Sequence, residues 1–296
     1  MKILAVLFLF VLSSIVNGQE ITFEFNPPDI TFNEILKTDK ITLVDGIKQK
    51  EDEITATMKI VLKKSNTGYR ISKTPMMMNS KRDGEVFQNP IFMFLTNIAT
   101  TGEIDKNGTL INVSGYESLI PRAKKELPAK VADAMMISAN EEAMINKAKA
   151  EWNARISDFA GQSVQIGNMF SGEGKFPLPN GEKLTFFSVV KVADTVEFEG
   201  RKCVKIEFKN SSTPEDLALF MGYSVEETSQ IFNFDANHGL RTSIILNGHG
   251  ERIIDPNTML IYSEKTFRRV EMKTEEMGDE SKTITTLETK EYIYEY

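Results

Sequence analysis

Apolar and polar residues alternate along much of this chain, as they do in β-strands with one buried face. The alternation is clearest in DEITATMKIVLKK, from Asp52 to Lys64, and Asn66-Thr67-Gly68 and a second alternating run follow it. This order predicts a hairpin. Further strands are predicted at 21–25, 30–44 and 182–192, around Val204, Ile206 and Phe208, and at 240–254, 258–274 and 281–295.

Short connections between these runs predict how the strands pair. The last three are joined by Asp255-Pro256-Asn257 and Met277-Gly278-Asp279, which are too short for a crossover, so the strands should be antiparallel. Asn107-Gly108 separates TGEI from TLINV, and this dipeptide favours a tight hairpin turn.

The periodicity changes from two to between three and four in the middle of the chain. Ile145, Ala148, Trp152, Ile156 and Phe159 fall on one helical face, and the other side is rich in charge. Ser138-Ala-Asn-Glu141 has the form of a capping box, which divides the region into helices near 129–137 and 139–158. Two shorter helices are predicted, one after Asn89-Pro90 and one from Thr213-Pro214 through Phe220.

These elements together predict an α+β fold. Its main part is a large, curved, antiparallel, meander-like sheet, a half-barrel or clamp, with a central helical insert at about 115–160 packed on its concave face. Gly115 and Pro121 end the strand before the insert. We expect residues 19–296 to form a single domain.

Residues 1–18 have the form of a secretory signal peptide. Lys2 supplies the positive start, Ile3 to Val16 the apolar core, and Gly18 the predicted cleavage position. The apolar stretch is shorter than a membrane span, so no transmembrane segment is expected after cleavage. The protein is therefore predicted to be secreted or periplasmic, and the sequence leaves open which.

Composition narrows the class of partner. The formal net charge of −7 disfavours binding to nucleic acid. Cys203 is the only cysteine, so an internal disulfide is excluded. Three N-x-S/T triplets, at Asn107, Asn112 and Asn210, are too short a signal to decide whether these residues are glycosylated.

No motif in the chain specifies a reaction, a cofactor or a metal. His238 and His249 stand beside glycines on expected turns or strand edges, without a second ligand at metal spacing. Cys203 is expected to be an inert core thiol. Adjacent carboxylates such as Glu226-Glu227 leave general acid-base chemistry open, although such runs are usually solvated.

Fourteen methionines provide the most distinctive feature of the composition, because methionine adapts to irregular apolar partners. Ordinary core packing explains many of them. The residues expected to line an apolar concavity are Phe92, Met93, Met135, Met136 and Trp152.

Four segments carry a resemblance to known proteins: IDKNGTLINVSGYE, FPLPNGEKLTFF, GRKCVKIEF and HGERIIDPNTMLIYSEKT. In their order they resemble a family of uncharacterised secreted bacterial proteins. At the level of fold, the chain is similar to lipoprotein carriers of the LolA and LolB type. That resemblance implies a curved antiparallel sheet that closes partly around helices and leaves an apolar concavity, and it carries over no site residue.

The sequence therefore favours a non-catalytic exported binding protein that holds a hydrophobic ligand, such as a lipid, or a protein segment in a concavity between sheet and helices. Two alternatives remain open: a secreted hydrolase whose carboxylates are assembled by the fold, and a structural exoprotein.

Overall fold

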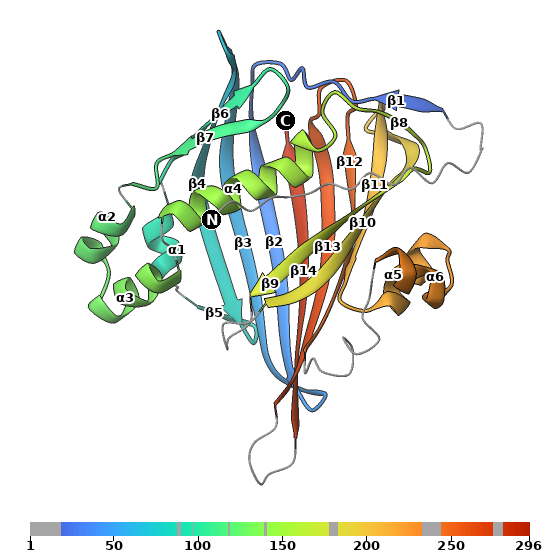
Figure 1. The fold of residues 1–296 in the computed structure, drawn as a ribbon. Helices are drawn as coiled ribbons and strands as arrows, with labels where there is room; N and C mark the ends of the chain where they lie inside the picture. The colour runs from blue at the N-terminus through green and yellow to red at the C-terminus, as the bar shows by residue number, and fades with distance from the viewer. Residues whose placement is uncertain are drawn as a thin grey trace.

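The structure is a computed structural model, and it describes residues 19–87, 90–96, 98–117, 119–138, 141–177, 183–232, 244–274 and 281–296. The expected signal peptide and His238 lie outside these residues. A 12-stranded antiparallel sheet forms most of the protein (Figure 1). The sheet is open: its two end strands, β7 and β9, each pair on one side only in the described part of the chain.

Two meanders share this sheet and meet where β2 pairs with β14, over Asn33–Val44 and Ile284–Glu295. The expected antiparallel meander is thus confirmed, with the two ends of the chain joined at its centre. The first meander comprises β2 (Ile30–Val44), β3 (Ile47–Ser65), β4 (Gly68–Arg82), β6 (Thr100–Asp105) and β7 (Leu110–Ser114), with β5 (Glu85–Val86) beside β4. The second comprises β14 (Lys282–Glu295), β13 (Ile261–Thr274), β12 (Ile244–Ile254), β11 (Arg201–Ser211), β10 (Lys183–Phe198) and β9 (Met169–Pro177).

The helical insert connects the two outer ends of the sheet. It begins after β7 and contains α2 (Leu119–Glu126), α3 (Ala129–Ser138), α4 (Glu141–Trp152) and a π-helical turn, η1 (Asn153–Ser157). Beyond it, β8 (Ser163–Gln165) pairs with β1 (Glu20–Thr22) in a separate two-stranded sheet. The ten spacings between neighbouring strands from β7 to β9 add up to roughly 48 Å across the sheet. Helix α4 and η1 together are about 25 Å long, so they cover about half of this width.

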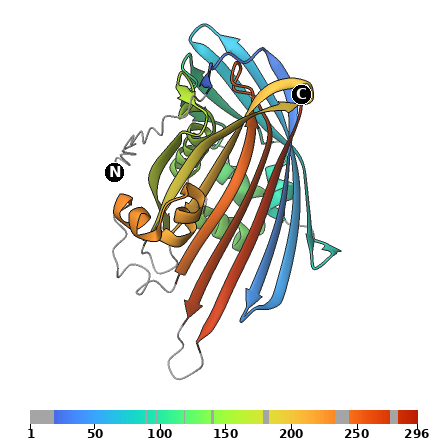
Figure 2. The same cartoon turned by 90° about the vertical axis from the view of Figure 1, so that its right-hand side faces the viewer.

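Helix α4 crosses in front of the central strands, while the two ends of the sheet curl forward on the same side (Figures 1 and 2). We call the side of the sheet that faces α4 the inner face, and the opposite side the outer face. The expected curved sheet with helices is confirmed. Only α4 and η1 lie across the inner face, whereas α2 and α3 lie near α1 (Pro90–Leu95), beside β4.

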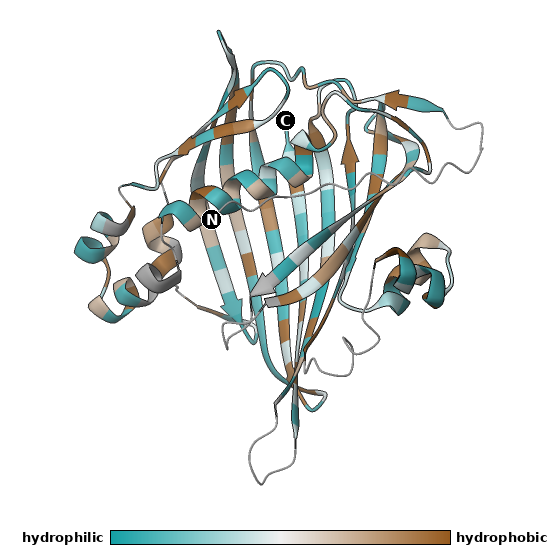
Figure 3. Ribbon diagram, in the orientation of Figure 1, coloured by the Kyte–Doolittle hydropathy of each residue, from teal (hydrophilic) through white to brown (hydrophobic). Residues whose placement is uncertain are grey.

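Two buried apolar clusters hold α4 and η1 on the inner face. Ile145 and Ala148 of α4 pack near Ile60 and Ile104, and Ile156 of η1 packs with strand residues of the second meander. Period-two alternation places these strand residues on one face, and it is visible as alternating bands of brown and teal along the strands (Figure 3).

Two more helices, α5 (Pro214–Met221) and α6 (Val225–Ile231), lie against the outer face beside β10 and β11 (Figure 1). The sequence predicts α5 from its Thr-Pro start but not α6, although Ser224 and Glu227 form a complete capping box. Helix α2 lies within the predicted helical insert at about 115–160, although the sequence did not give it separate bounds. Among the described residues, no helix is long and apolar enough to cross a membrane.

Candidate binding site

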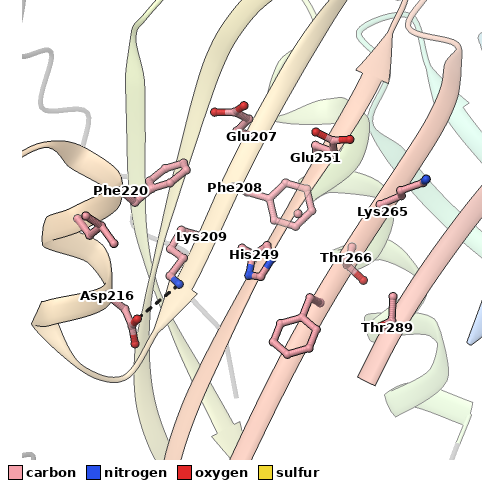
Figure 4. A pocket seen from close by; sticks show the side chains of 13 residues that line it. Glu207, Phe208, Lys209, Asp216, Phe220, His249, Glu251, Lys265, Thr266 and Thr289 are labelled. Atoms are coloured by element: carbon pink, nitrogen blue, oxygen red, sulfur yellow. Dashed lines mark ion pairs between the residues drawn. The ribbon is translucent and has the colours of Figure 1, made fainter. Parts of the chain in front are cut away.

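A hollow of about 550 Å³ lies on the outer face, between helix α5 and the strands β11 to β14. We call it the outer hollow. Phe220 of α5 lies on one side of it, and His249 on β12 lies on its floor (Figure 4). Leu219 of α5 and Phe267 of β13 also line it. His249 and Phe267 are opposite each other across the two strands, and their ring centroids are 5.1 Å apart. The centre of the hollow is therefore aromatic.

Local sequence fixes the position of α5 above the sheet. Pro214 lies in the first turn, and Gly222 ends the helix with a φ of 73°, in the left-handed region that glycine readily adopts. Leu217 is fully buried with Val189 of β10, which anchors the helix on the outer face. Because Leu219 follows two residues later on a different side of the helix, its side chain is 88% exposed.

The charged side chains around the outer hollow are paired with one another. Glu207 and Glu251 lie opposite each other on β11 and β12, and Lys205 binds both, at 2.9 and 3.0 Å. Lys209 lies 3.7 Å from Asp216 of α5. Lys265, on β13, pairs with Glu291 at 3.0 Å. The rim is thus polar but nearly neutral overall.

His249 is the titratable group at the centre of this site. Partial burial and the neighbouring Lys209 hold the pKa of His249 below its ordinary value, so the neutral ring is favoured in the folded protein. The folded state's preference for the neutral His249 ring has its full stabilising effect above the ordinary histidine pKa, and this effect is lost as the pH falls below it.

We therefore expect His249→Gln to reduce the fall in stability between pH 7 and pH 5.5. Thermal unfolding of the wild type and the variant across this range measures the difference. Equal pH dependence in the two proteins would show that His249 does not contribute.

A second polar cluster lies on the inner face, where Arg155 of η1 meets the sheet. Arg155 is 3.1 Å from Glu264 on β13 and 3.9 Å from Glu34 on β2, and it donates a hydrogen bond to the Tyr294 hydroxyl. Arg252 on β12 is 2.7 Å from Glu264 and donates to the carbonyl oxygen of Arg155 at 3.1 Å. We call these residues the Arg155 cluster.

The electrostatics of the Arg155 cluster indicate a structural role. Burial alone would raise the pKa of Glu264, but Arg252 and Arg155 together hold it below its ordinary value. A general acid at neutral pH needs the opposite shift. With two arginines and two carboxylates, the cluster is balanced in charge and joins η1 to four strands, β2, β12, β13 and β14.

The residues that the sequence predicts as lining an apolar concavity are dispersed in the structure. Trp152 lies at the end of α4, half-buried between the two inner clusters. Met93 is on α1 and is 65% exposed. Phe92 is also in α1, and Met135 and Met136 are in α3, but their side chains lie outside the described part of the structure. Their role in ligand binding stays a prediction.

Other chemical candidates occupy unremarkable positions. Cys203 is fully buried, and burial raises the pKa of its thiol to about 11, as expected for a core cysteine. His249 lies within a strand and not in a turn. In the described ranges, no three histidine, cysteine or acidic side chains are grouped closely enough to hold a metal ion.

The sequence did not identify the residues of the outer hollow as a site. Phe267 stands in an ordinary alternating strand, and nothing local distinguishes it from a core residue. The available signal was Leu217, Leu219 and Phe220 within one short helix, since these spacings put apolar residues on more than one side of it.

Comparison with known proteins gives only distant similarities. No family model matches the chain, and no curated protein matches it. A solved structure of lipovitellin, described by its lipid–protein interactions, is similar over 92% of this chain, at 9% identity and a TM-score of 0.46. This chain spans 26% of that one.

Two bacterial structures are also similar, each over 90% of this chain and with a TM-score of 0.21. One is a putative exported protein with a YmcC-like fold from Bacteroides fragilis, at 11% identity and 97% of its own length. The other is the β domain of the Bordetella autotransporter BrkA, at 7% identity and 99% of its length. None of the three is a LolA- or LolB-type carrier, so that resemblance stays a prediction.

Proposed function

We propose that this protein is an exported, non-catalytic binding protein that takes an uncharged apolar or aromatic ligand in the outer hollow. The observation that carries this proposal is the aromatic pair of Phe267 and His249 in a hollow that the exposed Leu219 also lines. Ligand sites are typically concave, largely apolar and lined by a few polar groups that fix orientation. Export follows from the predicted signal peptide.

The charges around the outer hollow favour an uncharged ligand. Lys205 forms an ion pair with both Glu207 and Glu251, and Lys209 is close to Asp216. A charged ligand would have to compete with these ion pairs, whereas an apolar ligand covers Phe267 without disturbing them. The neutral ring of His249 can donate a hydrogen bond to a carbonyl group on the ligand, or donate to or accept from a hydroxyl group.

The outer hollow fits this role better than the inner face does. The apolar residues of the inner face are already covered by α4 and η1, and the face beyond them carries charged side chains. The predicted carboxylate hydrolase receives no support from Glu207 and Glu251, because both are bound to Lys205 on an exposed surface.

Binding of N-phenyl-1-naphthylamine, an uncharged apolar dye that fluoresces when desolvated, tests the proposal. The wild type should bind it, and Phe267→Ala should weaken binding by at least about tenfold, because burying a phenylalanine side chain is worth about 1.5–3 kcal/mol. Titration of the dye at constant protein concentration measures its dissociation constants for the wild type and for Phe267→Ala.

A matched pair of surface variants separates the site from general surface stickiness. Leu219→Glu should weaken dye binding, whereas Val86→Glu should not, since Val86 is 80% exposed on β5, far along the sheet. Both side chains are exposed, so neither change should unfold the protein. An equal loss of dye binding in Leu219→Glu and Val86→Glu, or no dye binding by the wild type, would contradict the proposal.

A further inference from the structure

A row of charged side chains crosses the inner face beyond α4. In register from β13 to β4, the row reads Arg268, Glu288, Lys40, Asp52 and Arg82. Arg268, Glu288 and Lys40 lie an even number of residues from Glu264, Tyr292 and Glu34, which contact η1, so period-two alternation places them on the inner face. Asp52 and Arg82 lie on the same face because each is directly opposite the preceding residue of the row. We call them the inner charged row.

Each carboxylate in the row is enclosed by two cations. Asp52 lies 2.5 Å from Lys50 and 2.9 Å from Arg82, and its side chain is 18% exposed. Burial alone would raise the pKa of Asp52, but its bonds to Lys50 and Arg82 hold it below the ordinary value.

Glu288 has the same arrangement on the other side of the row. It lies 2.9 Å from Arg268 and 3.1 Å from Lys290, and its side chain is 14% exposed. The four cations that enclose the two carboxylates are 33–45% exposed. The cations therefore lie outermost and present positive charge to solvent.

Lys40 lies between the two carboxylates and adds to this excess. It is opposite Glu288 on one side and Asp52 on the other, yet it makes no ion pair within the described ranges. Lys290 and Lys50 are its diagonal neighbours, about 7–8 Å away, within reach of long side chains. With Glu85, which is opposite Arg82 across β4 and β5, five cations face three carboxylates, in a chain whose net charge is −7.

The row therefore holds more cations than its carboxylates can pair. The ammonium groups of Lys40, Lys50 and Lys290 can converge on a single ligand group that carries two or more negative charges. Lysine commonly binds phosphate as a point charge, and the neighbouring arginines supply flat donor pairs for its remaining oxygens.

We propose that the inner charged row, centred on Lys40, binds a soluble anion that carries a phosphate-type group. The concave shape of this face favours a soluble ligand over a bilayer surface, because the sheet ends curl forward on either side of it (Figures 1 and 2). Arg268, Glu288 and Lys40 lie four to six residues along their strands from the positions that contact η1. Helix α4 crosses the central strands in front of the inner face (Figure 1). This site is separate from the outer hollow.

Calorimetric titration with inorganic diphosphate at low ionic strength tests the inference. The wild type should bind diphosphate, with an affinity that falls as salt is added. Lys40→Gln should weaken binding at least about tenfold, because the unpaired cation of the site is removed while both carboxylates keep their partners.

Lys59→Gln is the matched control. Lys59 is exposed on the outer side of β3 and makes no ion pair in the described structure, so its replacement removes the same charge from the other face. It should leave diphosphate binding unchanged. The inference is overturned if the wild type gives no binding heat, if Lys59→Gln loses as much affinity as Lys40→Gln, or if only phosphatidylglycerol vesicles bind.

Discussion

Replacing Arg155 with alanine is expected to lower the free energy of unfolding by about 3–5 kcal/mol, the range for breaking a buried ion pair by removing one partner. Arg252 would still bind Glu264, but Glu34, which is 4% exposed, would lose its cation. The variant would also lose the guanidinium stacked 4.7 Å from the ring centroid of Tyr292. A buried carboxylate without a partner accounts for most of the loss.

The loss of unfolding free energy in Arg155→Ala should be larger at neutral pH than at acidic pH. The pKa of Glu264 is held below its ordinary value in the folded protein, so its contribution is complete above the ordinary glutamate pKa and is lost as the pH falls. Removing Arg155 weakens that contribution. The difference between wild type and Arg155→Ala should therefore be largest near pH 7 and shrink towards pH 4.

Urea unfolding followed by tryptophan fluorescence measures this effect, since Trp152 is the only tryptophan and lies three residues from Arg155. Arg70→Ala is the matched control: Arg70 is exposed and lies 4.0 Å from Glu103, so its loss should cost less than about 1 kcal/mol. Similar losses in both variants, or a difference that does not change with pH, would contradict a stabilising role for the Arg155 cluster.

The strands and their antiparallel order could be predicted because each is a local signal. Alternation over Asp52 to Lys64 and the Asn-Gly turn at Asn107 specify the strand and the hairpin without reference to the rest of the chain. Helix α5 was predicted for the same reason, from its Thr213-Pro214 start. The pairing of β2 with β14 was not predicted, since nothing local joins strands at opposite ends of a chain.

The buried position of Arg155 could not be predicted, because the sequence places it on the charged side of a regular helix. The π-helical turn from Asn153 to Ser157 changes the periodicity there and places Arg155 against the sheet. Its partners Glu34 and Glu264 lie far from it in the sequence, on the first and second meanders, so no local pattern indicates that the three residues meet. The charge balance that makes their burial acceptable exists only after the strands have assembled.

The outer hollow and the inner charged row escaped prediction for a related reason. Each is made of residues from four or more elements, and each residue alone is ordinary for its strand or helix. Lys40, for example, becomes unusual only when register places it between Glu288 and Asp52 without an ion pair.

Trp152→Ala is expected to lower the free energy of unfolding by about 3 kcal/mol, near the lower end for buried aromatic residues because Trp152 is only half-buried. Its indole nitrogen donates a hydrogen bond to the carbonyl oxygen of Gly108 at 2.7 Å, and its ring contacts both inner apolar clusters. The side chain therefore connects α4 to the β6–β7 hairpin and to the sheet. Circular dichroism during thermal and urea unfolding measures the loss without relying on tryptophan emission.

Trp152→Phe separates the two contributions and tests the location of the ligand site. It should keep most of the packing and lose about 1 kcal/mol with the hydrogen bond. Because Trp152 lies on the inner face and the outer hollow lies across the sheet, the Phe variant should bind the naphthylamine dye as the wild type does. Weakened dye binding in Trp152→Phe, with full binding in Phe267→Ala, would instead place the ligand in a concavity between α4 and the sheet.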